Sequence, residues 1–177
     1  DGGTTALVIA ASTVDGDLTL TSGNVAGITD TGTLTIGGNL SATTDDNAGV
    51  VTLDSLAVDG SIALATNSTG NATVSNDAGL EFAASTVGGA LTATAVTGNI
   101  TDSGALTIAG TSAFTTSADD ATITLNTSTN AFTGAVTLTT NDGDGTAANV
   151  TIDGGTTALV IAASTVDGDL TLTSGNV

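Results

Sequence analysis

Nine of the twenty amino-acid types are missing from this 177-residue sequence: Lys, Arg, His, Cys, Met, Trp, Tyr, Pro and Gln. Without Lys or Arg the segment has no electrostatic attraction for phosphate, which excludes nucleic-acid binding and argues against docking on anionic membranes. Without His or Cys it cannot build an ordinary zinc, haem or iron–sulfur site, a disulfide, or a Ser/His/Asp or Cys/His nucleophile. The longest purely apolar run, Ala6–Ala11, is far shorter than the ~20 residues that span a bilayer. We therefore expect no membrane insertion by this segment.

What remains is acidic and rich in β-branched residues. The formal charge is −18, from 17 Asp and the single Glu81, and the aromatics are Phe82, Phe114 and Phe132. High charge with few aromatics is typical of disorder. Here 40% of the residues are hydrophobic and alternate regularly with Thr and Ser, which favours an ordered β-structure.

The chain repeats itself. Residues 1–25 return letter for letter as residues 153–177, so the period is 152 residues. Residues 1–152 are then one tandem unit, and residues 153–177 are the start of the next. Such a window is expected to be a slice of a longer array, in which residues 1–177 form one continuous segment.

A second, older duplication lies inside the unit. Residues 28–38 match residues 100–110 at eight of eleven places, and residues 10–20 similarly match residues 83–93. The unit therefore divides into a diverged half-repeat, 28–99, and a second half that begins at residue 100.

Short runs with apolar residues at every second position predict half-buried strands throughout. Strands at this spacing fit a β-sandwich, a barrel or a β-solenoid. The near absence of aromatics and the nested repetition favour the solenoid, because each coil buries its inner face only against its neighbours. At about 22 residues per coil the chain makes roughly eight coils and a rod roughly 35–40 Å long. The alternation predicts these inward residues: Leu18, Leu20, Leu34, Ile36, Leu53, Ile62, Leu64, Phe82, Leu91, Leu106, Ile108, Phe114, Ile123, Leu125, Val136, Leu138 and Ile152.

The segments 100–108 (ITDSGALTI) and 11–20 (ASTVDGDLTL) resemble the repeats of giant bacterial surface proteins of the filamentous-haemagglutinin and autotransporter-adhesin type. The resemblance runs over the whole chain, although its motif is only glycine with alternating Leu and Thr. It implies a single-stranded right-handed parallel β-helix, export to the cell surface and an adhesive or fibrous role. It carries over no catalytic or ligand residue.

Acidic loops offer one candidate site. Clustered carboxylates and Asn oxygens beside glycine are suitable calcium ligands, and the best candidates are Asn141, Asp142 and Asp144. The spacing is not that of an EF-hand, however, and solvated turns explain the same residues. No cofactor is required by the sequence, and Ca²⁺ is the one ion that it suggests.

Thr-x-Thr pairs offer a second candidate, because their hydroxyls point outward when the flanking Leu or Ile point inward. The pairs are 19/21, 33/35, 92/94, 122/124, 137/139 and 171/173. A flat Thr face is typical of ice-binding surfaces, whereas ordinary β-propensity explains the same residues. Asn-x-Ser/Thr triplets begin at Asn39, Asn67, Asn71, Asn99, Asn126 and Asn149, and each is a potential glycan acceptor.

The sequence thus predicts a structural segment of a long extracellular fibre or stalk rather than an enzyme. A glycosidase-like carboxylate pair would need aromatic or cationic neighbours that the composition does not supply. The expected partners are neighbouring repeats of the same chain, other fibres and cell-surface glycans. The alternative function is a binding module that uses the outward Thr face for ice or a glycan surface, and a regular Thr ladder across consecutive coils would favour it.

Overall fold

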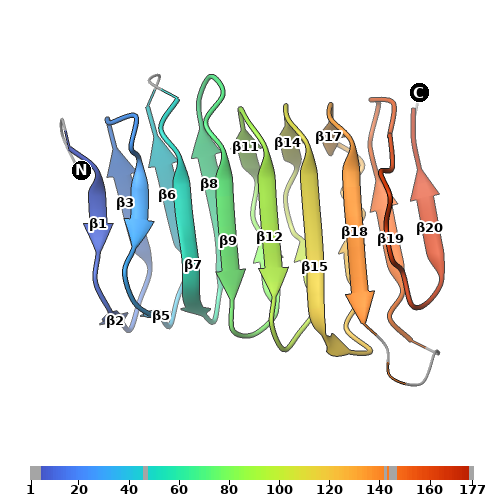
Figure 1. Ribbon diagram of the computed structural model, residues 1–177, viewed down its shortest axis with the longest axis horizontal. Helices are drawn as coiled ribbons and strands as arrows, with labels where there is room; N and C mark the ends of the chain where they lie inside the picture. Colours follow the sequence, from blue (N-terminus) through green and yellow to red (C-terminus); the bar gives the residue numbers. More distant parts are fainter. Residues whose placement is uncertain (1–4, 46–47, 142, 144–146, 176–177) are drawn as a thin grey trace.

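The computed structural model describes residues 5–45, 48–141, 143 and 147–175. The regular secondary structure of these residues consists of β-strands alone. The strands form two sheets that face each other along the whole molecule (Figure 1). Every strand pair is parallel, as expected when successive coils of one chain stack on each other. The described residues include no helix that is long and apolar enough to cross a membrane.

The first sheet, sheet A, has nine strands. These are β1 (Leu7–Ile9), β2 (Ser12–Val14), β4 (Ile28–Asp30), β5 (Leu34–Ile36), β7 (Val51–Val58), β9 (Ala72–Asn76), β12 (Leu91–Ala95), β15 (Ser112–Asp119) and β18 (Val136–Asn141).

The second sheet, sheet B, has eleven strands. These are β3 (Leu18–Ser22), β6 (Leu40–Thr44), β8 (Ser61–Thr66), β10 (Leu80–Phe82), β11 (Ser85–Val87), β13 (Ile100–Asp102), β14 (Leu106–Ile108), β16 (Ile123–Leu125), β17 (Ala131–Phe132), β19 (Val150–Asp153) and β20 (Leu170–Thr173). The chain alternates between the two sheets, so the fold is the β-solenoid that the sequence predicts.

The number of coils follows from the order of strands in sheet A. Seven levels run from β1 through β4, β7, β9, β12 and β15 to β18, and the eighth is formed where Val136 bridges to Ile161. Ile161 is the repeat equivalent of Ile9 in β1. One 152-residue unit is therefore seven coils, which corresponds to an axial repeat of roughly 34 Å at about 4.8 Å per coil.

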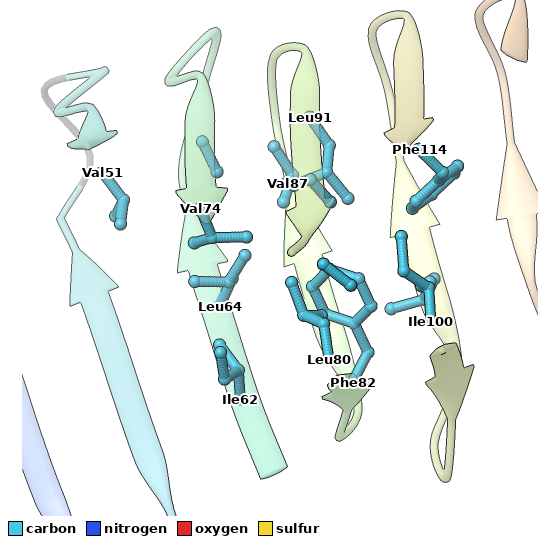
Figure 2. Close-up of a cluster of buried hydrophobic side chains, with 14 of the residues drawn as sticks. Val51, Ile62, Leu64, Val74, Leu80, Phe82, Val87, Leu91, Ile100 and Phe114 are labelled. Carbon is cyan, nitrogen blue, oxygen red and sulfur yellow. The ribbon is translucent and has the colours of Figure 1, made fainter. Parts of the chain in front are cut away.

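The core is a thin layer of side chains between the sheets. Figure 2 shows that side chains from both sheets, among them Val74 of β9 and Leu64 of β8, meet in this layer. All the predicted inward residues are buried except Leu18, which is only partly buried because it lies in the first coil. Thr35 and Thr107 are exposed and Thr137 is half-buried, so the predicted register is correct.

Matching motifs of the two half-repeats lie on opposite faces of the rod. The motif 28–36 forms β4 and β5 in sheet A, whereas the matching motif 100–108 forms β13 and β14 in sheet B. Because seven coils are shared by two halves, a half-repeat advances the chain by three and a half coils. Each half thus repeats the other after a half turn about the rod, and only the full unit returns a motif to the same face.

This half turn also exchanges the number of strands that each sheet has per coil. In the first two coils sheet A has two short strands per coil, such as β4 and β5, while sheet B has a single strand such as β6. From β9 onward sheet A has a single strand per coil, and sheet B carries pairs such as β13 and β14. Segments that match in sequence between the two half-repeats are therefore related by a half turn about the rod axis together with a shift along it.

Candidate functional site

Outward threonines of sheet A form a column along the rod axis. The column lies in register across four consecutive coils and consists of Thr29, Thr52, Thr73 and Thr92. Their neighbours within each strand point into the core, so the hydroxyl and methyl groups lie on the outer surface of the sheet. All four are half-buried or exposed, as expected on a sheet face flanked by further coils.

A second hydroxyl column lies beside the first. It consists of Ser75, Thr94, Thr115, Thr139 and Thr165, again in register from coil to coil. The two columns lie side by side on β9 and β12, where each strand carries a hydroxyl in both. Ala113 on β15 interrupts the first column, and Thr137 on β18 lies in line with it again beside Thr139. Neighbouring hydroxyls are about 4.8 Å apart along the axis and about 6.8 Å apart along a strand. Sheet A thus presents a two-dimensional grid of small polar groups.

Sheet B carries the screw-related column. It consists of Thr101, Thr124, Thr151 and Thr171, which are paired through β13, β16, β19 and β20. These four are the half-repeat counterparts of the first column on sheet A. The half turn therefore places a four-threonine column on both broad faces of the rod.

Sequence patterns located only part of this grid. The pair 92/94 contributes one residue to each column of sheet A, and the pair 137/139 contributes Thr139 to the second column. Most column members, including Thr29, Thr52 and Thr73, belong to no Thr-x-Thr pair. They come together because coils of different length bring them into register. The spacing from Thr73 to Thr92 is 19 residues, and that from Ala113 to Thr137 is 24. No fixed sequence period could have revealed the columns.

The carboxylates lie mainly at the narrow edges of the rod. Asp15, Asp59, Asp77 and Asp167 are in turns between strands, and Glu81 is an exposed acid on the surface of a strand, β10. Of the 14 acidic residues that the structure describes, eight lie in turns or loops between strands and six lie in strands. Repulsion between rods is therefore expected to be strongest edge to edge.

Two aspartates at the ends of matching strands, Asp30 and Asp102, make equivalent hydrogen bonds in the two half-repeats, and we call these positions acidic corners. The Asp30 carboxylate accepts hydrogen bonds from the backbone N–H groups of Asp54 (3.3 Å) and Ser55 (3.0 Å) one coil further. Its counterpart Asp102 accepts the equivalent bonds from Asn126 (3.0 Å) and Thr127 (3.3 Å).

Asp102 has one further partner, because the Asn130 side-chain amide donates to its carboxylate at 2.7 Å. The Asn130 side-chain oxygen in turn accepts the Leu106 N–H at 2.7 Å, inside the core. These corner carboxylates therefore cap backbone donors of the adjacent coil.

The predicted calcium loop lies largely outside the described residues, which exclude Asp142 and Asp144. Asn141 is exposed, and its side-chain amide donates to an Asp119 carboxylate oxygen at 2.8 Å. At the base of the loop, the buried Thr140 hydroxyl donates to the Ala148 carbonyl at 3.1 Å. Elsewhere in the described chain no group of three acidic, His or Cys side chains is placed to hold a metal. The calcium site stays a prediction.

Four of the six potential glycan acceptors take part in a different interaction. The side-chain oxygens of Asn39, Asn71, Asn99 and Asn149 each accept a backbone N–H one coil further along, at 2.9, 2.8, 2.8 and 2.6 Å. Each of these Asn side chains is in an exposed turn immediately before a strand. These residues therefore connect coils at the edge of the rod.

A hollow of about 370 Å³ lies beside the turns that precede β8 and β10. Asp59 and Glu81 line it, together with small residues such as Gly60 and Gly79. Its lining includes no aromatic side chain that would stack on a sugar. The expectation that this segment is not an enzyme continues to rest on composition.

The stacked parallel coils and the two-level repetition define a β-solenoid repeat protein. A family model matches residues 2–68 and 69–139, well over half of the chain. The chain belongs to this family, which is described as "Repeats of unknown function (DUF5649)". The first match spans β1 to β8 and the second spans β9 into β18, so each is close to half a unit. No curated protein and no solved structure matches the chain.

Proposed function

We propose that this chain is a structural segment of a long extracellular fibre or stalk, in which tandem units add length to a rod at the cell surface. The observation that carries the proposal is the whole number of coils per unit. Because a unit is seven coils, each added unit extends the rod and returns the repeated motif to the same sheet. Continuous backbone hydrogen bonding along the axis provides the mechanical link.

The surface location is supported by the resemblance of residues 11–20 and 100–108 to repeats of bacterial surface fibres. The absence of Lys and Arg is consistent with this role, because trypsin finds no cleavage site in the segment. Relief of the acidic repulsion at the edges would come from external cations.

Surface labelling tests this function. Antibodies raised against residues 1–177 should label intact cells of the source, with gold particles away from the cell boundary, and brief treatment of the cells with proteinase K should remove the label. An antibody against a cytoplasmic protein is the control and should label only permeabilised cells. Label that needs permeabilisation would refute the extracellular role.

The threonine grid favours a second function, a binding module for an ice or glycan surface. Hydroxyl groups repeat along the rod axis in this ladder, and on β9 and β12 they also repeat along the strand, as a ligand with a regular surface requires. Thr92 and Thr94 lie at its centre on β12, one in each column.

Matched variants test this binding. Ice shaping and thermal hysteresis, together with a glycan-array screen, should detect a ligand for the native chain, and Thr92→Lys should abolish the signal. Thr129→Lys makes the same charge change in an exposed turn outside the grid and should leave the signal intact. If the native chain gave no signal in either assay, the binding function would be refuted, and the structural role in a rod would be the one proposal that stands.

A further inference from the structure

The repeated 25-residue string is present in two different surroundings in this structure. The described part of the first copy, residues 5–25, forms the first coil. β4, β5 and β6 of the second coil pair with the edge of this coil that faces the C-terminal end of the rod, which we call the upper edge. The described part of the second copy, residues 153–175, forms the last coil, and β18 and β19 pair with its opposite, lower edge, which faces the N-terminal end of the rod. The same coil is therefore seen once with each of its two possible neighbours.

The two copies share several local features. β3 and β20 cover equivalent residues in sheet B, and Thr165 bridges to β18 at the position equivalent to Thr13 of β2 in sheet A. The Ser12 hydroxyl donates to the Ala10 carbonyl at 2.9 Å, and the equivalent Ser164 hydroxyl donates to the Ala162 carbonyl at 2.9 Å. Because the two neighbours occupy opposite edges of one conformation, a single coil can hold both.

The exposed fractions of equivalent core side chains show that the upper edge of the repeated coil is buried only when another coil covers it. Leu20 is 7% exposed where β6 covers it, whereas its equivalent Leu172 is 44% exposed on β20, the last strand of sheet B. Leu170 is likewise 44% exposed. The upper edge of residues 153–177 thus presents apolar surface together with the outer edge of a strand, and in copy one the same edge is paired.

We propose that residues 153–177 form a joint coil shared by consecutive units, and that its occupant is the following unit of the same chain. The residues equivalent to 40–44 would pair with β20 in the register seen between β3 and β6, in which Leu18 pairs with Leu40 and Leu20 with Ala42. This inference rests on the proposed tandem rod. It adds that the rod is continuous across the junction, with no hinge between units.

A polar ladder continues through the joint coil. The Asn149 side chain accepts the Asp169 N–H at 2.6 Å, which links the end of one unit to the joint coil. In the first copy Asp17, the equivalent of Asp169, accepts the Asn39 N–H at 2.7 Å. The Asn39 side chain then accepts the Ser61 N–H at 2.9 Å. Joined units would therefore extend one ladder of Asn and Asp side chains from coil to coil across the boundary.

Single cysteines test the joint directly, because the native chain has none. The comparison is between the 177-residue chain and a two-unit chain in which residues 26–177 are repeated after Val177. Leu172→Cys should react with a thiol reagent at least about tenfold more slowly in the two-unit chain, since a covered core position opens rarely. Thr171→Cys, on the outer surface of the same strand, should react equally in both chains.

Amide hydrogen exchange gives a second readout that needs no substitution. The Leu18 N–H donates to the Asn39 carbonyl at 2.8 Å, so the equivalent Leu170 N–H should become protected only in the two-unit chain. Equal reactivity of Leu172→Cys, or equal exchange at Leu170, in the two chains would overturn the joint coil. That outcome would leave the solenoid of each unit intact, whereas failure of the proposed function would appear as absent surface label with the joint still protected.

Discussion

Replacing Phe114 tests how the thin core is stabilised. Phe114 on β15 is fully buried and lies between Phe82 on β10 and Phe132 on β17. Its ring contacts both others edge to face, with centroid distances of 6.3 Å and 6.1 Å and interplanar angles of 79° and 81°. The three rings are the entire aromatic content of the chain. Loss of the central ring therefore removes both aromatic contacts at once.

The expected cost follows from these contacts. Large-to-small substitution of a buried Phe costs ~3–5 kcal/mol, and Phe114→Ala should lie at the upper end because both ring pairs are lost. Phe114→Leu keeps most of the apolar volume but loses the two edge-to-face contacts, each worth ~0.5–1.5 kcal/mol, so it should cost about 1–3 kcal/mol. Leu138→Ala, on the paired strand β18, is the control that creates a cavity without removing a ring.

Urea unfolding followed by far-UV circular dichroism measures the total change, and amide exchange locates it. Since each coil contacts only its neighbours, protection should fall in β12, β15 and β18 and stay unchanged in β3 and β6. A double-mutant cycle of Phe114→Leu with Phe82→Leu should show a coupling of ~0.5–1.5 kcal/mol. Equal costs for Phe114→Ala and Phe114→Leu, or a loss of protection spread evenly along the rod, would refute the reasoning.

Three further predictions concern polar groups. Asp102→Ala should destabilise the chain by about 1 kcal/mol more than Asp30→Ala, because only Asp102 accepts a third, side-chain hydrogen bond, and equal urea midpoints would contradict this. The Ser112 hydroxyl is buried without a hydrogen-bond partner, so Ser112→Ala should raise the stability by about 1 kcal/mol; a loss of stability would show that the hydroxyl is satisfied. Millimolar Ca²⁺ should raise the thermal midpoint more than NaCl of matched ionic strength, and the calcium-specific part should vanish when Asp142 and Asp144 are replaced by Asn.

The exchange of faces after half a unit accounts for an exact repeat with the period of the full unit, 152 residues. A half-repeat copied alone would present its paired short strands to the wrong sheet of the next coil. Two halves in succession restore the original face, as the position of Ile161 above Val136 in sheet A shows. The 152-residue unit is therefore the smallest one that can be stacked on itself without changing faces.

The sequence by itself determined the β-solenoid, its coil number and nearly all of its core. These follow from local rules, because alternate side chains of a strand point to opposite faces whatever the strand pairs with. Thus Leu34 and Ile36 are buried and Thr35 is exposed, as the alternation alone predicts. Leu18 is the exception, since its burial depends on a neighbouring coil as well as on its own strand.

Only the tertiary structure decided which residues lie beside one another across coils. Coil lengths vary, so the register that aligns Thr52 with Thr73 cannot be read from a fixed period. The same holds for the opposite faces of the two half-repeats, because a half turn depends on where each turn falls in space. The corner roles of Asp30 and Asp102 also arise from contacts between residues more than twenty positions apart. Alternation is a property of one strand, whereas columns, faces and corners are properties of the stack.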